Sequence, residues 1–135
     1  MNETRDRVGE PGGERRVSKL TLYGYKKCGT CKKAEKWLGE QGVDYTFVDI
    51  TTDPPQRSVL KQAIEGERYE VKHLYNTSGK AYREGGWTEK RKTLSEAKQL
   101  DALAKNGRLI KRPIVTDGES FTIGFKEDVF AEVWG

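Results

Sequence analysis

The stretch LTLYGYKKCGTCKK, residues 20–33, decides how the rest of the chain is interpreted. Its first four residues alternate leucine with threonine and tyrosine, which predicts a β-strand over residues 20–23. Residues 24–29 begin and end with glycine, which favours a loop. The chain's two cysteines, Cys28 and Cys31, then stand at the start of a helical pattern. We therefore expect both thiols at a strand-to-helix turn.

A helix is predicted over residues 30–41, because one set of positions recurs at helical spacing and the lysines fall on the other side. The inward face is expected to carry Cys31, Ala34, Trp37, Leu38 and Gln41. Gly42 should end the helix. Residues 45–50 alternate like a second strand. The order strand, helix, strand predicts a parallel βαβ unit with a right-handed crossover.

The middle of the chain, about residues 53–107, predicts mainly helical structure. Short helices are expected over residues 56–65 and 70–74, and a loop over residues 76–80. Thr93 and Glu96 have the spacing of a capping box, which predicts Thr93 as the N-cap of a helix closed by Asn106 and Gly107. The inward residues of that helix are expected to be Leu94, Ala97, Leu100, Leu103 and Ala104.

The sequence pattern at the end of the chain predicts a β-hairpin followed by a last helix. Residues 113–116 and 121–124 are the two expected strands, with Asp117-Gly118 in the turn between them. A helix over about residues 127–133 follows. The whole pattern is βαβ, a helical middle, then ββα, which is an α/β fold.

Residues 1–17 are rich in glycine and in charges of both signs, so we expect a disordered tail there and one folded domain over residues 18–135. The N-terminus lacks the apolar core of a secretory signal, and no apolar run approaches the roughly 20 residues of a membrane span. We therefore expect a cytoplasmic protein that does not enter a membrane.

The charge balance sets expectations about partners. Twenty-five basic and 21 acidic residues give a net charge of +4 and a pI of about 9.0. A protein that binds nucleic acid directly more often has a larger excess or aromatics interleaved with its basic residues. We expect no direct nucleic-acid contact, a local anion site, and a monomer.

Two cysteines three residues apart have three interpretations. In a reducing compartment such a pair is typical of redox chemistry, and Cys28, placed just before a helix, gains a stabilised thiolate from the free N–H groups there. We also expect the neighbouring lysines, Lys26, Lys27, Lys32 and Lys33, to raise the local positive potential. Two buried cysteines close by chance are the second interpretation. A structural zinc site is the third, although zinc needs four ligands and the chain adds one histidine, His73.

A second set of candidate residues comes from distant parts of the chain. Lys111 and Arg112 form a basic pair directly before the strand that starts at Pro113. On the pattern alone, the peptide bond before Pro113 could be cis, with Pro113 beside the cysteines, or trans, with Pro113 at the start of an edge strand. Asn76 and Ser78 have side chains that can bond an oxyanion, or simply cap a turn.

The motifs LTLYGYKKCGTCKKAEKWL, LYNTSGKAYRE, NGRLIKRPIV and IGF, in this order, resemble the arsenate reductase (ArsC)/Spx family over about residues 19–134. The resemblance is closest to the family's small, uncharacterised arsenate-reductase-like members of the Spx/MgsR type. It implies a thioredoxin-like fold with a helical insertion, as in ArsC. It also implies that Cys28 is the nucleophile, that Arg112 points at its thiolate or at an anionic ligand, and that Pro113 is a cis-proline.

The resemblance suggests two functions. A thiol–disulfide oxidoreductase would use Cys28 to attack and Cys31 to resolve, with Gly29, Thr30, Asn76, Ser78 and Pro113 shaping the substrate site. It would hold no bound cofactor or metal and would take electrons from glutathione or from a thioredoxin or glutaredoxin system. The alternative is an Spx-type regulator, in which a Cys28–Cys31 disulfide controls binding to the C-terminal domain of the RNA polymerase α subunit.

Arsenate reduction itself is the less favoured activity. Glutaredoxin-linked arsenate reductases of this family bind their oxyanion with three arginines. Arg112 matches one of them. Phe125 follows the Ile123-Gly124 pair where the second is expected, and residues 75–78, YNTS, lack the third.

Overall fold

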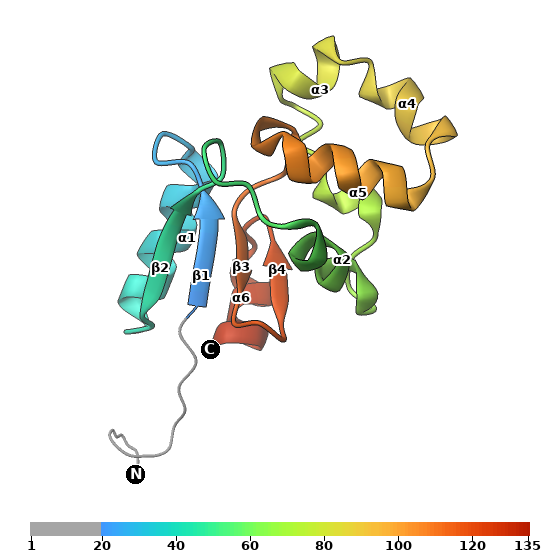
Figure 1. Ribbon diagram of the computed structural model, residues 1–135. Helices are drawn as coiled ribbons and strands as arrows, with labels where there is room; N and C mark the ends of the chain where they lie inside the picture. The colour runs from blue at the N-terminus through green and yellow to red at the C-terminus, as the bar shows by residue number, and fades with distance from the viewer. Residues whose placement is uncertain (1–19) are drawn as a thin grey trace.

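A four-stranded mixed sheet lies at the centre of residues 20–135, the part of the chain that the computed structural model describes (Figure 1). Its strand order is β2-β1-β3-β4. The strands are β1 (Leu20–Gly24), β2 (Tyr45–Asp49), β3 (Ile114–Thr116) and β4 (Phe121–Ile123). β1 pairs parallel with β2 and antiparallel with β3, and β3 pairs antiparallel with β4. The tail predicted over residues 1–17 lies outside the described residues.

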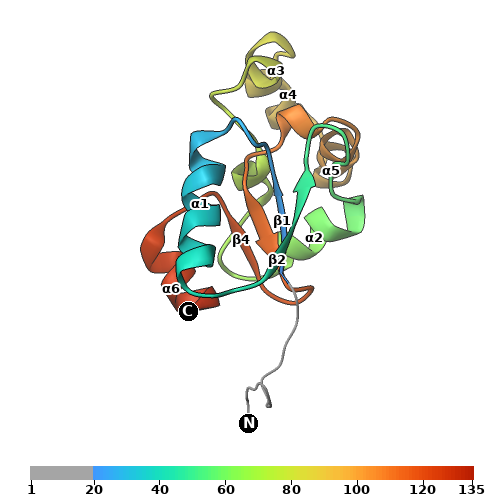
Figure 2. The same ribbon diagram turned by 90° about the vertical axis from the view of Figure 1, so that its left-hand side faces the viewer.

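Helices cover both faces of this sheet. α1 (Gly29–Glu40) and α6 (Glu127–Trp134) lie on one face, and Figure 2 shows them together on one side of the strands. α2 (Arg57–Glu65), the 3-10 helix η1 (Val71–Leu74) and α5 (Glu96–Lys105) belong to the other side. Two hydrophobic clusters result, one under α1 and α6 and one between the sheet and the helical middle. This is the α/β fold that the sequence pattern predicts, in the thioredoxin-like form with a helical insertion that the family resemblance implies.

The helix that carries the cysteines forms as expected. Cys31, Ala34, Trp37 and Leu38 are its buried residues. Gly42 follows in the left-handed conformation, with φ 70°, so it ends the helix without the steric penalty of a side chain. Gln41 is exposed, because it lies at the C-cap and no longer on the packed face.

The predicted N-cap at Thr93 is wrong. Thr93 is the last residue of a separate helix, α4 (Trp87–Thr93), and its hydroxyl donates to the Lys90 carbonyl at 3.3 Å. Ser95 caps α5 instead, accepting the Lys98 N–H at 3.2 Å. The extended backbone of Leu94 separates the two helices.

The inward face of α5 also differs from the prediction. Leu100 and Leu103 are buried as expected, but Ala97 is exposed. Gln99 is buried in its place, where its amide donates to the Leu94 carbonyl at 3.0 Å and accepts from the Tyr75 hydroxyl at 2.8 Å. A buried amide is stable inside a core when both its N–H and its oxygen are hydrogen-bonded. A pattern of apolar residues does not reveal that such a polar side chain is buried.

The insertion also contains helices that the sequence pattern did not separate. α3 (Lys80–Glu84) begins where the loop over residues 76–80 was expected to end, and α4 follows across Gly85 and Gly86. Gly107 begins a second 3-10 helix, η2 (Gly107–Leu109). A Cβ atom at Gly107 would lie 1.6 Å from the Ile50 carbonyl oxygen, so this glycine permits a close backbone approach between the insertion and the end of β2.

The C-terminal hairpin and helix match their predictions. β3 and β4 pair directly, and Gly118 occupies the turn with φ 99°. The pairing brings the residues before β3 beside β1, since Ile114 lies opposite Tyr23. Among residues 20–135 no helix has both the length and the apolar character required to cross a membrane.

Candidate functional site

Cys28 lies at the N-cap of α1, half-buried, with its backbone extended. Its N–H donates to the Tyr25 carbonyl at 3.0 Å, which closes the loop after β1. The sulfur therefore sits where the first N–H groups of the helix have no partner inside the helix, a position that stabilises negative charge.

The pKa of Cys28 is lowered from its ordinary value. Burial acts in the opposite direction, but hydrogen bonds to the sulfur outweigh it. Their donors are the backbone and thiol of Cys31, the Arg112 guanidinium and the Thr30 backbone. Donors that bond the charged form favour ionisation, so Cys28 is the thiol of the pair that ionises more readily.

Cys31 has the opposite character. Its side chain is fully buried, and burial is the largest cause that raises its pKa, to about 12. The neighbouring Cys28 raises it further, while the Tyr25 N–H, 3.4 Å from the Cys31 sulfur, acts to lower it. Both thiols are free in this structure. A half-buried thiol with a lowered pKa and a buried thiol with a raised pKa therefore lie next to each other.

Gly24, the last residue of β1, makes room for Cys31. A Cβ atom at position 24 would lie 2.9 Å from the Cys31 sulfur and 2.9 Å from the Leu22 side chain. Its φ is not in the left-handed region, so space and not backbone conformation is the requirement. The sequence pattern marks Gly24 only as the start of a loop and does not reveal this requirement for space.

Arg112 supplies the positive charge beside the Cys28 sulfur. Its guanidinium bonds Cys28 and also lies over the Tyr25 ring, with 5.5 Å from Cζ to the ring centroid. The Arg112-Pro113 peptide bond is cis, as the family resemblance implied. Pro113 itself is buried, and its carbonyl accepts the Gly124 N–H at 2.8 Å, which ties the segment before β3 to the end of β4.

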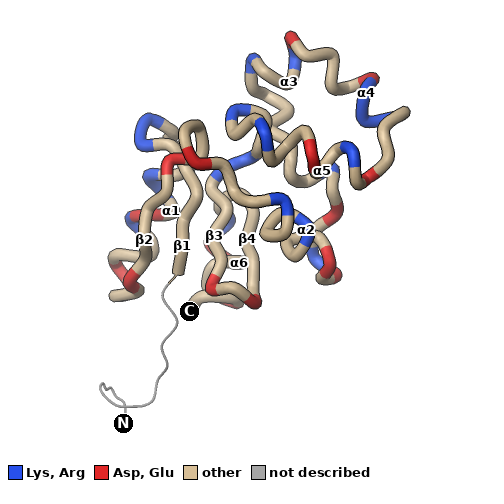
Figure 3. Tube along the Cα trace, viewed as in Figure 1, with Lys and Arg blue, Asp and Glu red and all other residues tan. Residues whose placement is uncertain are grey.

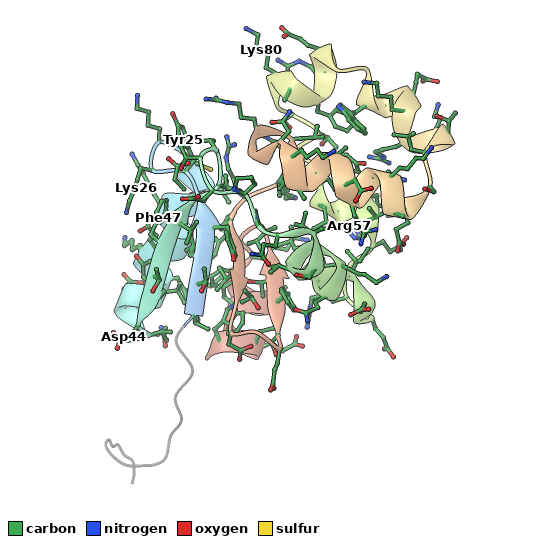
Figure 4. All side chains as sticks on the ribbon, in the orientation of Figure 1. Tyr25, Lys26, Asp44, Phe47, Arg57 and Lys80 are labelled. Carbon is green, nitrogen blue, oxygen red and sulfur yellow. The ribbon has the colours of Figure 1, made fainter. Side chains whose placement is uncertain are left out.

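Lys26, one of the four lysines near the cysteines, has partners of its own. It pairs with Glu35 at 3.2 Å and lies over the Phe47 ring, 4.1 Å from its centroid (Figure 4). None of the four lysines is among the groups that shift the pKa of Cys28. Figure 3 shows Lys and Arg positions between β1 and β3 at the end of the sheet where α1 begins.

A cleft of about 400 Å³ opens above Cys28 and joins parts of the chain that are distant in sequence. Its wall opposite α1 comes from the insertion, because Tyr75 forms a β-bridge with Ile110. The Asn76 N–H donates to the Leu109 carbonyl at 2.8 Å, and the Lys111 N–H donates to the Leu74 carbonyl at 2.7 Å. These bonds place residues 76–78 next to Arg112.

Five of the predicted site residues line this cleft together: Cys28, Thr30, Asn76, Ser78 and Arg112. Cys31 is buried next to Cys28, and Pro113 lies behind the lining. Gly29 does not line the cleft. It is exposed as the first residue of α1, with no atom within 4 Å of the place where a Cβ would stand.

Thr77 and Lys111 also line the cleft, together with two side chains that were not predicted to form the site, Tyr75 and Phe125. Phe125 packs on Phe130 with ring centroids 4.7 Å apart, and Tyr75 is almost fully buried, so both give the cleft an apolar component. Lys111 adds a second cation beside Arg112. The basic pair before Pro113 indicated that Lys111 belongs near the site. The sequence did not show which way the Lys111 side chain points, because that depends on the bridge between Tyr75 and Ile110.

The ArsC family model matches residues 23–133, so the chain belongs to the ArsC family. YusI from Bacillus subtilis strain 168, an uncharacterised protein, is 50% identical over 115 residues, which cover 85% of this chain and 98% of YusI. A protein from Streptococcus mutans UA159 whose structure is described as a possible arsenate reductase superposes with a TM-score of 0.76. It is 36% identical and the match covers 84% of this chain and 98% of that protein.

Global transcriptional regulators are also among the relatives. Spx from Streptococcus pyogenes is 29% identical over 109 residues, which cover 81% of this chain and 80% of Spx. The resemblance to the ArsC/Spx family that the motifs indicated is thus confirmed over residues 23–133.

Proposed function

We propose that the protein is a cytoplasmic thiol–disulfide oxidoreductase that uses Cys28 and Cys31 as its redox pair. The observation that carries the proposal is the asymmetry of the two thiols. Cys28 has a lowered pKa and opens into a cleft, whereas Cys31 is buried beside it with a pKa raised to about 12. A thiol that attacks a substrate needs a lowered pKa and access to the cleft. A thiol that resolves the mixed disulfide must stay protonated until that disulfide has formed, which burial and a raised pKa favour.

The reaction proceeds in two exchanges. The Cys28 thiolate attacks one sulfur of a substrate disulfide, forms a mixed disulfide and releases the first substrate thiolate. Cys31 then loses its proton and attacks the Cys28 sulfur, which forms the Cys28–Cys31 bond and releases the second thiolate. Two electrons pass from the protein to the substrate, and external glutathione or a thioredoxin-type protein returns them.

The order of the exchanges follows from the electrostatics. While Cys28 is a thiolate, its charge helps to keep Cys31 protonated. Once Cys28 is bound to the substrate sulfur, that charge is gone and one cause of the raised Cys31 pKa disappears. Cys31 thus becomes easier to ionise at the stage where it must attack.

The cleft walls favour an organic disulfide over arsenate. Arg112 and Lys111 provide positive charge, but Phe125 and Tyr75 occupy wall positions with aromatic rings. An oxyanion bound without water needs charge-assisted donors around it, and a phenyl ring offers none. An organic disulfide instead gains from apolar contact near the reacting sulfur.

The test is a redox titration of the purified protein in glutathione buffers, read by alkylation and intact mass. A reversible loss of two hydrogen atoms, two protons and two electrons, with a midpoint between roughly −180 and −300 mV supports the proposal. Cys31→Ser should stop at a mixed disulfide between Cys28 and glutathione, and Cys28→Ser should form neither product. Thiols that remain inert to oxidant in the wild-type chain contradict the proposal.

The second candidate function is an Spx-type redox regulator, favoured by the similarity to Spx over 81% of this chain. In that function the Cys28–Cys31 disulfide changes binding to the C-terminal domain of the RNA polymerase α subunit. Retention of the isolated domain on immobilised protein, with a dependence on reductant that Cys31→Ser abolishes, would support the regulator. No retention of the domain in either redox state would exclude it.

A further inference from the structure

A second hollow lies beside the cleft that contains Cys28. It has a volume of about 250 Å³ and shares two lining residues, Lys111 and Gly124, with the cleft. The two spaces therefore adjoin along the backbone that follows β4. A ligand that places its sulfur at Cys28 reaches this hollow by passing Lys111.

The second hollow is basic. Arg68, His73, Lys111 and Lys126 line it, and each comes from a different segment of the chain. None of its lining residues is Asp or Glu. Among residues 20–135, neither Lys111 nor Lys126 has an ion-pair partner, whereas Arg68 pairs with Glu132 at the surface.

His73 adds an imidazole donor to this set. Its Nδ1 accepts the Glu70 N–H at 2.9 Å, which fixes the ring and leaves Nε2 as the ring donor. The Tyr69 ring packs edge-on against it with centroids 5.9 Å apart. An oxygen anion in the hollow thus has ammonium, guanidinium and imidazole donors around it.

Gly124 keeps the passage between the two spaces open. Its φ is 81°, and a Cβ atom there would lie 3.1 Å from Lys111 Cε. The Lys111 side chain lies along this bare stretch of backbone, where its ammonium group can serve either space. Any side chain at position 124 would displace it.

The other neighbour of the cleft carries a carboxylate in its lining. This third hollow shares Asn76 and Arg112 with the cleft, and its charged side chains also include Lys80, Arg108 and Glu84. Glu84 lies 3.9 Å from Lys80 and would face an anionic group bound there. The hollow on the Lys126 side has no carboxylate in its lining, which is the difference between the two sides of Cys28.

We propose that the hollow lined by Arg68, His73, Lys111 and Lys126 binds a carboxylate of the same molecule whose sulfur reacts with Cys28. The substrate class is a thiol or disulfide that carries a carboxylate a few bonds from its sulfur. A small peptide disulfide such as glutathione disulfide and an acidic segment beside a protein disulfide share this chemistry. The inference rests on the proposed thiol exchange at Cys28.

The experiment measures the rate at which the reduced full chain reacts with disulfides of different charge, read by acid quench and intact mass. Glutathione disulfide carries carboxylates, bis(2-hydroxyethyl) disulfide is neutral and cystamine is cationic. The readout is the ratio of the rate constants for glutathione disulfide and for the neutral disulfide. We expect Lys126→Gln and His73→Gln each to lower this ratio by about three- to tenfold, the range for one lost polar or charged contact.

A matched control removes the same charge elsewhere. Lys98→Gln, on the exposed side of α5, should leave the ratio unchanged. Raising the salt concentration should reduce the wild-type ratio, since exposed ionic contacts are screened. An equal fall for Lys98→Gln would show a general effect of net charge and would overturn the inference.

The source of the carboxylate is separated by a second pair of probes. Two peptide disulfides that differ only in Glu or Gln next to the cysteine replace glutathione disulfide. A Lys126-dependent preference for the Glu peptide that exceeds the preference for glutathione disulfide assigns the hollow to a protein segment, and the reverse order assigns it to the small peptide.

Failure of this inference differs from failure of the proposed function. If wild-type protein reacts with all three disulfides and the ratio is unchanged in Lys126→Gln and His73→Gln, the carboxylate site is wrong and the redox pair stands. If Cys28 reacts with none of the disulfides, both are overturned.

Discussion

The sheet and the helical insertion contribute different things to the same cleft. Residues 20–53 and 110–135 carry the two cysteines at the start of α1 and Arg112 in the segment before β3, and the buried face of α1 anchors the cysteines. Residues 54–109 provide Tyr75, Asn76 and Ser78 from an irregular segment, and their outermost helix, α4, has no buried residue. The sulfur chemistry is thus held by the sheet and α1, and the substrate contact by the insertion.

This division teaches that the two parts can be altered separately. The two hydrophobic clusters lie on opposite sides of the sheet, so a change in the insertion need not disturb α1. Changes near the sheet should alter the reactivity of the thiols, and changes in the insertion should alter the affinity for substrate. The following substitutions test that separation.

The largest effect is expected from Cys28→Ser, which removes the nucleophile. Disulfide reduction should fall about a thousandfold or more, because loss of a covalent catalytic group removes the pathway and not a single contact. Cys28 is half-buried, so the fold should persist. Steady-state reduction of a model disulfide, with the thermal unfolding midpoint as a control, measures both; residual activity near wild type would place the reaction at another group.

Gly107→Ala should break the junction between the two parts. The new Cβ would lie 1.6 Å from the Ile50 carbonyl oxygen, a backbone contact that no rotamer relieves. We expect a loss of about 3 kcal/mol or more in the free energy of unfolding. Gly39→Ala, on the exposed side of α1 with no atom near, should instead stabilise by about 0.5–1 kcal/mol. Urea unfolding of both variants measures the two free energies of unfolding. Equal values would contradict the close approach of the backbone at Gly107 to Ile50.

Arg112→Met should make the Cys28 thiolate less stable without disturbing the insertion. Removing a charge-assisted hydrogen bond should slow disulfide reduction about ten- to a hundredfold at neutral pH. The pKa of Cys28 should rise, because a group that favours the charged form is lost, so the pH profile of alkylation by iodoacetamide should move to higher pH. Lys26→Gln is the matched control and should leave the profile in place, since Lys26 pairs with Glu35.

The smallest effect is expected from Ser78→Ala in the insertion. Loss of one hydrogen bond to substrate should raise KM about two- to tenfold, with the pH profile of Cys28 alkylation unchanged. Ser58→Ala, exposed on α2, is the matched control for a lost hydroxyl and should leave KM at the wild-type value. A shifted alkylation profile in Ser78→Ala would show that the two parts are coupled after all.

The sheet and α1 could be predicted from the sequence because their signals are local. The alternating residues of β1, the spacing of Ala34 and Trp37, and Gly42 after the helix each specify their own conformation. Cys28, Cys31 and Arg112 followed from those elements together with the family resemblance. Their roles in catalysis stay predictions until the experiments above are done.

The insertion was harder because its determinants are not local. Ser95 and Thr93 both suit an N-cap, and the choice depends on where α4 ends. Lys111 joins the cleft through its backbone bond to Leu74, and Gly107 is fixed by Ile50, far away in sequence. No periodic pattern encodes such contacts, so the sequence alone could suggest the charges near Pro113 but not their arrangement.

The aromatic contacts give each part of the molecule its own intrinsic fluorophore. Trp37 lies on α1 and packs against Phe130, with 5.5 Å between the ring centroids. Trp87 packs against Tyr75, a residue of the cleft wall, with 5.7 Å between the ring centroids. Trp134 donates from its indole to the Thr122 hydroxyl at 3.0 Å. With three tryptophans in the chain, variants that keep one at a time would report optically on thiol oxidation, on occupation of the cleft and on docking of the last helix, without an added label.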